Sequence, residues 1–134
     1  MSEHQCVGAL IVQQESILLG LRSPTRAFYP NVWDIFGGHV DAGEQPEQTL
    51  VRELHEELGI TAMRWRHVET LRLAHTDHGE IHFEIYLLLE WSGVPVNQQP
   101  EEHAMIRWFR IGQAVQLPLA DPSYPEVFTR VLRP

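Results

Sequence analysis

Short hydrophobic runs alternate with polar or glycine- and proline-containing stretches along most of the chain. Small and β-branched residues fill positions 6–12, and a second apolar run follows at 17–21 after a short polar stretch. Two apolar runs separated in this way are typical of a β-hairpin. Four later runs predict further strands, at residues 33–36, 68–74, 81–89 and 106–111.

The run at 81–89 places an apolar side chain at every second position from Ile81 to Leu87. This alternation predicts a strand with one buried face. A polar stretch, 75–79, separates it from the run at 68–74, so the two runs are expected to form a second hairpin.

Residues 44–59 have the signals of an α-helix. Pro46 suits a first helical turn, Glu47 favours the positive N-terminal end, and Gly59 is placed to end the helix. A second helix is predicted at 124–132, after a proline-containing loop. This order of elements predicts one domain over residues 1–134 with an α/β (α+β) fold, in which a mixed β-sheet has helices packed on its faces.

The first predicted helix has two stripes. An apolar stripe comprises Leu50, Val51, Leu54 and Leu58, and it is expected to pack on the sheet. Three carboxylates one turn apart, Glu53, Glu56 and Glu57, occupy the other stripe, with Arg52 at its edge. Their oxygens can converge on one point.

Like charges at helical neighbours repel, which suggests that something positive binds there. Oxygen ligands without thiolates or clustered imidazoles favour Mg²⁺, Mn²⁺ or Ca²⁺ over zinc. The alternative is a solvated helix face with internal salt bridges, which is the usual meaning of such a charge cluster. The residues that flank the cluster decide between the two.

Composition limits the partners. The formal net charge of −8 argues against binding of long nucleic acid through a broad basic surface. Cys6 is the only cysteine, so a disulfide-stapled secreted scaffold is not expected. The N-terminal residues do not look like a leader and no apolar run is long enough for a membrane helix, so a cytoplasmic location and no membrane contact are expected.

The stretch from Gly38 to Ile60 resembles the signature of the Nudix hydrolases, GHVDAGEQPEQTLVRELHEELGI. Every position that the family box specifies matches: Gly38, Glu44, Arg52, Glu53, Leu54, Glu56, Glu57, Gly59 and Ile60. The N-terminal hairpin, Trp33-Asp34 before the paired glycines, and Arg107-Trp108-Phe109 also look like family features. One departure is Phe36, where many members have proline.

The resemblance implies a mixed sheet sandwiched between helices and a loop-helix-loop catalytic motif. It implies that Glu53, Glu56 and Glu57, with the backbone carbonyl of Gly38, hold Mg²⁺ or alternatively Mn²⁺. Arg52 resembles the arginine that orients these glutamates. Glu44 resembles the acidic residue that supports that arginine from the loop.

The implied reaction is in-line attack of water on a phosphorus atom of a diphosphate. The general base is expected to be Glu53 or Glu57, with Glu101, Glu102 and His103 as later alternatives. Candidate substrate contacts are Arg22 and Arg26 for phosphate and Phe28, Tyr29, Phe83 and Tyr86 for stacking on a base.

Three functions are compatible with these residues. The expected one is hydrolysis of a nucleoside triphosphate or another nucleoside diphosphate linked to a further moiety, such as an ADP-sugar or a dinucleotide polyphosphate. A nucleotide sensor without hydrolysis is the second, and the intact glutamate set argues against it. A Ca²⁺ store ranks last because the alternating aspartates of a calcium loop are missing. The protein is expected to be a monomer or a homodimer.

Overall fold

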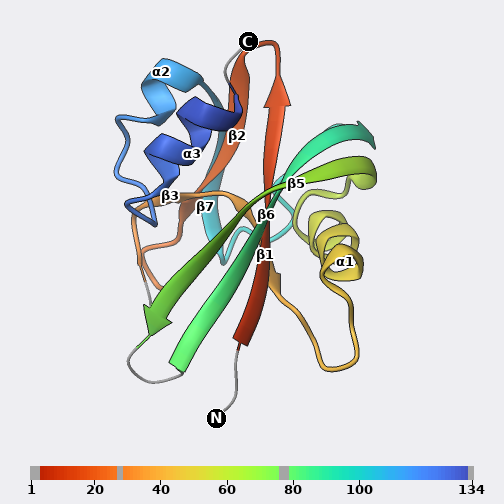
Figure 1. The fold of residues 1–134 in the computed structure, drawn as a ribbon. Helices are drawn as coiled ribbons and strands as arrows, with labels where there is room; N and C mark the ends of the chain where they lie inside the picture. The colour runs from red at the N-terminus through yellow and green to blue at the C-terminus, as the bar shows by residue number, and fades with distance from the viewer. Residues whose placement is uncertain (1–3, 27–28, 76–78, 133–134) are drawn as a thin grey trace.

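The structure, a computed structural model, describes residues 4–26, 29–75 and 79–132. Within these described residues, seven strands and three helices follow one another (Figure 1). The strands are β1 (His4–Gln13), β2 (Ser16–Arg22), β3 (Trp33–Asp34), β4 (Phe36–His39), β5 (Thr61–His75), β6 (Gly79–Ser92) and β7 (His103–Arg110). The helices are α1 (Pro46–Leu58), α2 (Ile111–Ala114) and α3 (Tyr124–Val131).

The sheet has two parts, which are joined where the end of β1 pairs with β2. In one part β1 lies between β4, which pairs with it antiparallel, and β6, which pairs with it parallel, and β5 forms the edge beside β6. In the other part β2 lies between β3 and β7. The predicted β1–β2 hairpin is present, but only Val12 and Gln13 of β1 pair with β2, so the two strands diverge into different parts of the sheet.

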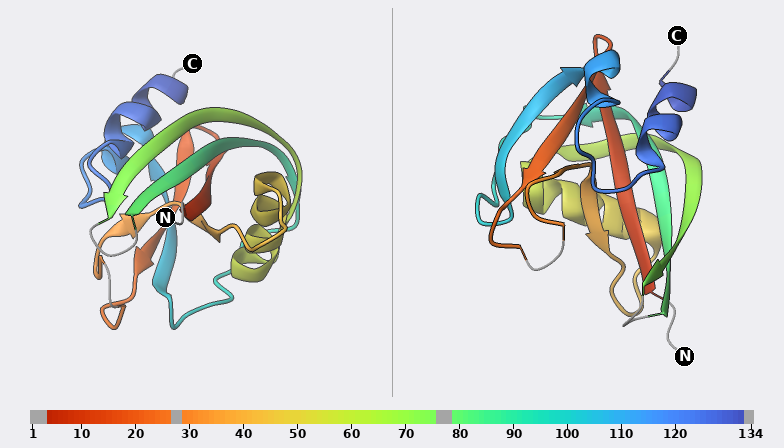
Figure 2. Two further views of the ribbon diagram at one scale, coloured as in Figure 1. Left: turned by 60° about the horizontal axis from the view of Figure 1, so that its bottom comes forward. Right: turned by 90° about the vertical axis from the view of Figure 1, so that its left-hand side faces the viewer.

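Both faces of β1 are buried, and they face different helices. Val7, Ala9 and Ile11 pack in a core with the apolar stripe of α1, whereas Leu10 packs in a second core with α3. The further views show α1 and α3 on different sides of the strands (Figure 2). The predicted mixed sheet between helices is therefore confirmed.

Helix α1 begins and ends close to the predicted positions. Pro46 occupies its first turn, and Gln45 and Gln48 form a capping box that the sequence analysis did not identify. Gly59 ends the helix in the left-handed conformation, with φ of 71°, and donates its N–H to the carbonyl of His55.

Three strand predictions were wrong in detail. The single strand predicted at 33–36 is two strands, because Trp33 and Asp34 pair with β2 whereas Phe36 pairs with β1. Strand β5 begins at Thr61 instead of residue 68, and the last strand ends at Arg110 because Ile111 starts α2.

The early part of β5 escaped detection for a physical reason. It is an edge strand with register shifts between Ala62 and Arg64 and between Arg64 and Trp65, and such irregularities break the alternation of buried and exposed side chains. Residues 76–78 of the predicted turn lie outside the described residues. No helix in the described part of the chain is long and apolar enough to cross a membrane.

Candidate functional site

A cleft of about 640 Å³ opens beside the start of β1, and it is lined from several parts of the chain. Strands β1 and β6 contribute one wall with Cys6, Ile81 and Phe83. The segments around β2 and β3 contribute Arg22 and Asp34. The β4–α1 region contributes an acidic end, which includes Gly38, Glu53 and Glu57.

Glu57 is the most enclosed carboxylate of the acidic end. Its side chain is 6% exposed, and its Oε2 accepts the N–H of Gly37 at 3.1 Å. Burial, and next the neighbouring charges of Glu53 and Glu102, raise the pKa of Glu57 to about 9. Without a cation, this environment favours the protonated form of Glu57 over the carboxylate.

Glu53 lies next to Glu57 but is less enclosed, with 17% of its side chain exposed. Burial also raises the pKa of Glu53, while Arg52 opposes this shift. A Cβ at Gly38 would lie 2.5 Å from Cδ of Glu53, so only glycine lets the backbone approach this carboxylate so closely. The glycine at the start of the box is thus explained by packing against the acidic helix.

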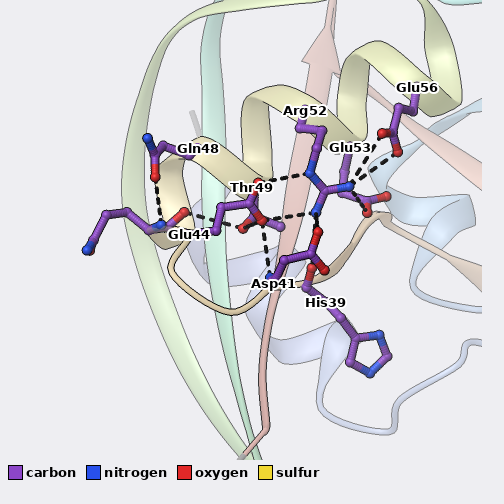
Figure 3. A network of polar contacts seen from close by, with 9 residues as sticks. His39, Asp41, Glu44, Gln48, Thr49, Arg52, Glu53 and Glu56 are labelled. Carbon is purple, nitrogen blue, oxygen red and sulfur yellow. Dashed lines mark hydrogen bonds and ion pairs between the residues drawn. The ribbon is translucent and has the colours of Figure 1, made fainter.

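Arg52 ties the acidic residues together (Figure 3). Its Nε and Nη2 donate to both oxygens of Glu44, at 2.9 and 3.0 Å, and its Nη1 donates to Glu53 at 3.0 Å. Nη1 also approaches Glu56 at 3.3 Å. The paired hydrogen bonds to Glu44 fix the plane of the guanidinium, which in turn fixes Glu53.

Glu44 is held in its place by further groups. Thr49 donates its hydroxyl to Glu44 Oε1 at 2.6 Å, and the N–H of Asp41 approaches the same oxygen at 3.2 Å. The hydrogen bonds from Arg52 and then Thr49 lower the pKa of Glu44 to about 2. Asp41 also pairs with Arg52 at 3.3 Å. Thr49 and Asp41 were missed by the sequence analysis because the family signature leaves both positions unspecified.

The donor set fits a hard divalent cation. Glu53 and Glu57 place two largely enclosed carboxylates side by side beside the backbone of Gly38, and carboxylate and carbonyl oxygens are the ligands that hard divalent cations prefer. Glu56 is the predicted ligand that lies apart, since 46% of its side chain is exposed and it contacts Arg52. In this arrangement no three acidic, histidine or cysteine side chains of the described residues converge as a ready ligand set.

The predicted substrate residues divide into two groups. Arg22, Arg26, Tyr29 and Phe83 all line the cleft. Tyr86 does not line the cleft. It follows Phe83 by three positions on β6, and an odd number of positions along a strand places a side chain on the opposite face. Tyr86 therefore packs toward α1 and His67. Phe28 lies outside the described residues.

Arg22 belongs to a network that the sequence analysis did not foresee. Its Nη1 contacts Asp34 Oδ2 at 3.1 Å, and its Nε donates to the carbonyl of Tyr29 at 2.9 Å. The other oxygen of Asp34 accepts the hydroxyl of Tyr124 and the N–H of Ile35, both at 2.8 Å. Burial raises the pKa of Asp34. Helix α3 thus supports the floor of the cleft.

The later candidates for the general base also separate. Glu101 is exposed and does not line the cleft, whereas Glu102 and His103 do. His103 is buried at 6% exposure, and its Nε2 lies 3.6 Å from Glu57 Oε1. Burial, and next the charges of Arg26 and Arg22, lower the pKa of His103 to about 4.

Comparison with known proteins agrees with this geometry. A family model described as NUDIX domain matches residues 2–131. The CTP pyrophosphohydrolase of Escherichia coli is 32% identical over 121 residues, which cover 90% of this chain and 86% of that protein. An 8-oxo-dGTP diphosphatase of Escherichia coli is 32% identical over 95 residues, which cover 71% of this chain and 73% of that protein.

Solved structures give the same result. The crystal structure of a MutT NUDIX hydrolase from Burkholderia pseudomallei has a TM-score of 0.85 at 28% identity, covering 98% of this chain and 99% of that one. The solution structure of the E. coli ORF135 protein has a TM-score of 0.81 at 29% identity, covering 100% of this chain and 95% of that one. Given the box residues, the acidic cleft and these likenesses, the chain belongs to the NUDIX domain family and is a Nudix hydrolase.

Proposed function

We propose that the protein is a divalent-metal-dependent pyrophosphohydrolase that cuts a phosphoanhydride bond of a nucleoside triphosphate. The observation that carries this proposal is the pair of enclosed carboxylates, Glu53 and Glu57, at one end of a cleft that also holds Arg22 and Phe83. Carboxylates approach phosphates only through a cation, so an acidic end in a nucleotide cleft supports a metal site.

The proposed ligands are Glu53, Glu56, Glu57 and the backbone of Gly38. Mg²⁺, or Mn²⁺ in its place, supplies positive charge for the phosphate oxygens and makes a bound water more acidic. Glu56 joins this set only by turning away from Arg52, and its half-exposed side chain has room to do so. Arg52 and Glu44 do not touch the substrate in this proposal, and they hold Glu53 in position.

Glu53 suits the role of general base better than Glu57. A base must reach a water molecule in the cleft, and the side chain of Glu53 is 17% exposed against 6% for Glu57. Glu57 is also anchored through its Oε2 to Gly37. We therefore assign proton removal to Glu53 and cation binding to Glu57.

A nucleotide fits the rest of the cleft. Phe83 and Ile81 offer an apolar wall for a base, and Arg26 lies at the cleft with 27% of its side chain exposed. Asp34 and Arg22 place an acceptor beside a donor at the cleft floor, which suits the polar edge of a base. The relatives named for CTP and 8-oxo-dGTP support triphosphates as the first substrates to try.

The test is pyrophosphate and phosphate release from a panel of nucleoside triphosphates, oxidised nucleotides, dinucleotide polyphosphates and ADP-ribose. Turnover is expected with Mg²⁺ or Mn²⁺ and is expected to stop when a chelator is added. The Glu53→Gln variant should lose turnover by a factor on the order of 10³ while still binding nucleotide. The matched control is Glu47→Gln, on the same helix, where the carboxylate contacts Trp65 outside the cleft.

Nucleotide binding without turnover across the whole panel would favour the sensor function instead. Turnover that persists in excess chelator would contradict the metal-dependent mechanism. Near wild-type activity of Glu53→Gln would move the base to another residue, and Glu102 would be the next to test because it also lines the cleft.

A further inference from the structure

Both the backbone and the ring of His103 are held in place by neighbouring residues. It is the first residue of β7, where its backbone N–H donates to the carbonyl of Gln99 at 3.0 Å and its carbonyl accepts the amide of Asn97 at 2.8 Å. Its ring stacks on Phe36, with centroids 5.1 Å apart and planes 11° apart. A Cβ at Gly20 would lie 2.6 Å from its Cδ2.

The two ring nitrogens of His103 have different surroundings. Nε2 lies 3.6 Å from Oε1 of Glu57. Nδ1 is buried without a hydrogen-bond partner among the described residues. A buried N–H without an acceptor is costly, so the single proton of a neutral ring belongs on Nε2, and a doubly protonated ring is disfavoured. The ring therefore directs a donor at Glu57.

The Nε2–H group of His103 faces one of the two oxygens of the Glu57 carboxylate. Oε2 of Glu57 already accepts the N–H of Gly37 at 3.1 Å, whereas Oε1 lies 3.6 Å from His103 Nε2. At 3.6 Å the contact with His103 is longer than a hydrogen bond. A small rotation of the Glu57 side chain closes it, and such contacts in active sites often tighten when the site is loaded.

We propose that His103 is a positioning residue that donates Nε2–H to Oε1 of Glu57 and holds this carboxylate in the orientation in which it binds a divalent cation. Gly37 and His103 then fix one oxygen each, so Glu57 cannot turn away from the cleft. The inference rests on the proposed role of Glu57 in metal binding. It adds a residue outside the box, contributed by β7, to the machinery that places the metal.

The test compares two substitutions of equal size and flexibility. His103→Gln keeps an N–H donor that can reach Glu57, whereas His103→Met has none. The dissociation constant of Mn²⁺ is measured by titration calorimetry without nucleotide, and kcat and KM are measured separately. Far-ultraviolet circular dichroism and thermal melts confirm folding, and His103→Leu replaces the Met variant if the latter does not fold.

Mn²⁺ binding by the Gln variant is expected within about threefold of wild type, and the Met variant is expected to bind roughly 10- to 100-fold more weakly. In the Met variant kcat should fall while KM for the nucleotide changes little. Equal Mn²⁺ affinity in the Met variant and the wild type would overturn the role of His103 alone, and so would equal weakening in both variants. Failure of the wild type itself to bind Mn²⁺ would instead overturn the proposed metal site, and this inference with it.

Discussion

Replacement of Glu57 by glutamine should make the metal-free protein more stable while it removes activity. Burial, and next Glu53, raise the pKa of Glu57 from 4.5 to about 9. In the unfolded chain the group returns to its ordinary value. Between these two pH values the folded protein therefore holds one proton more than the unfolded chain, so the free energy of unfolding falls as the pH rises.

The size of this effect follows from the shift. Each pH unit above 4.5 costs about 1.4 kcal/mol of stability until the pH reaches the folded-state pKa. The resulting loss of unfolding free energy is at most about 3 kcal/mol at pH 7 and below about 1 kcal/mol at pH 5. Glutamine has no such dependence, and it can still accept the N–H of Gly37 and donate to Glu53.

The assay is thermal unfolding in excess chelator at pH 5, 7 and 8.5. The melting temperature of Glu57→Gln should exceed that of the wild type by up to about 10 °C at pH 7, and the difference should shrink at pH 5 and grow at pH 8.5. Adding Mn²⁺ should raise the melting temperature of the wild type more than that of the variant. Turnover should be almost abolished in the variant.

The matched control is Glu56→Gln. The Glu56 side chain is half exposed and pairs with Arg52 at the surface, so its removal should change stability by less than about 1 kcal/mol. A constant difference between wild type and Glu57→Gln from pH 5 to pH 8.5 would refute the argument that burial of this carboxylate destabilises the metal-free protein.

Two further predictions concern the support of the acidic end. Gly38→Ala should lower kcat at least tenfold and change stability much less, because the new methyl group displaces the carboxylate end of the flexible Glu53 side chain. Steady-state kinetics and urea unfolding measure the two effects. Gly112→Ala, where a Cβ would have no neighbour within 4 Å, should change neither. Glu44→Gln should lower kcat roughly 10- to 100-fold with little change in nucleotide KM, since Arg52 loses the pair of charged hydrogen bonds that fixes its plane and so positions Glu53 less firmly. If kcat/KM fell by the same factor through a rise in KM alone, Glu44 would contact the substrate instead.

Local signals in the sequence were sufficient for the acidic helix. Pro46 and Gly59 bound it because a proline fits a first turn and a glycine adopts the left-handed conformation at the end, and both depend only on near neighbours. The leucine spacing also placed the helix correctly on the sheet, with Leu50, Leu54 and Leu58 all fully buried.

The residues that line the cleft beside this helix were harder to predict from the sequence. Tyr29, Phe83 and Tyr86 were all expected near the substrate. Tyr29 and Phe83 line the cleft, whereas Tyr86 lies on the other face of β6. Choosing residues by type ignored the alternation of the strand that carries them. Asp34 was noticed only as a family feature, and its contact with Tyr124 joins residues 90 positions apart.

By itself, the sequence determined the family, the extent of α1, the mixed sheet between helices and the acidic stripe, because each depends on short-range spacing or on a contiguous motif. Only the tertiary structure decided which carboxylate is buried deepest, that Glu56 lies apart on Arg52, and that His103 from β7 faces Glu57. Burial and the approach of distant segments set the pKa values and the hydrogen-bond partners. Neither can be read from residues that are neighbours along the chain.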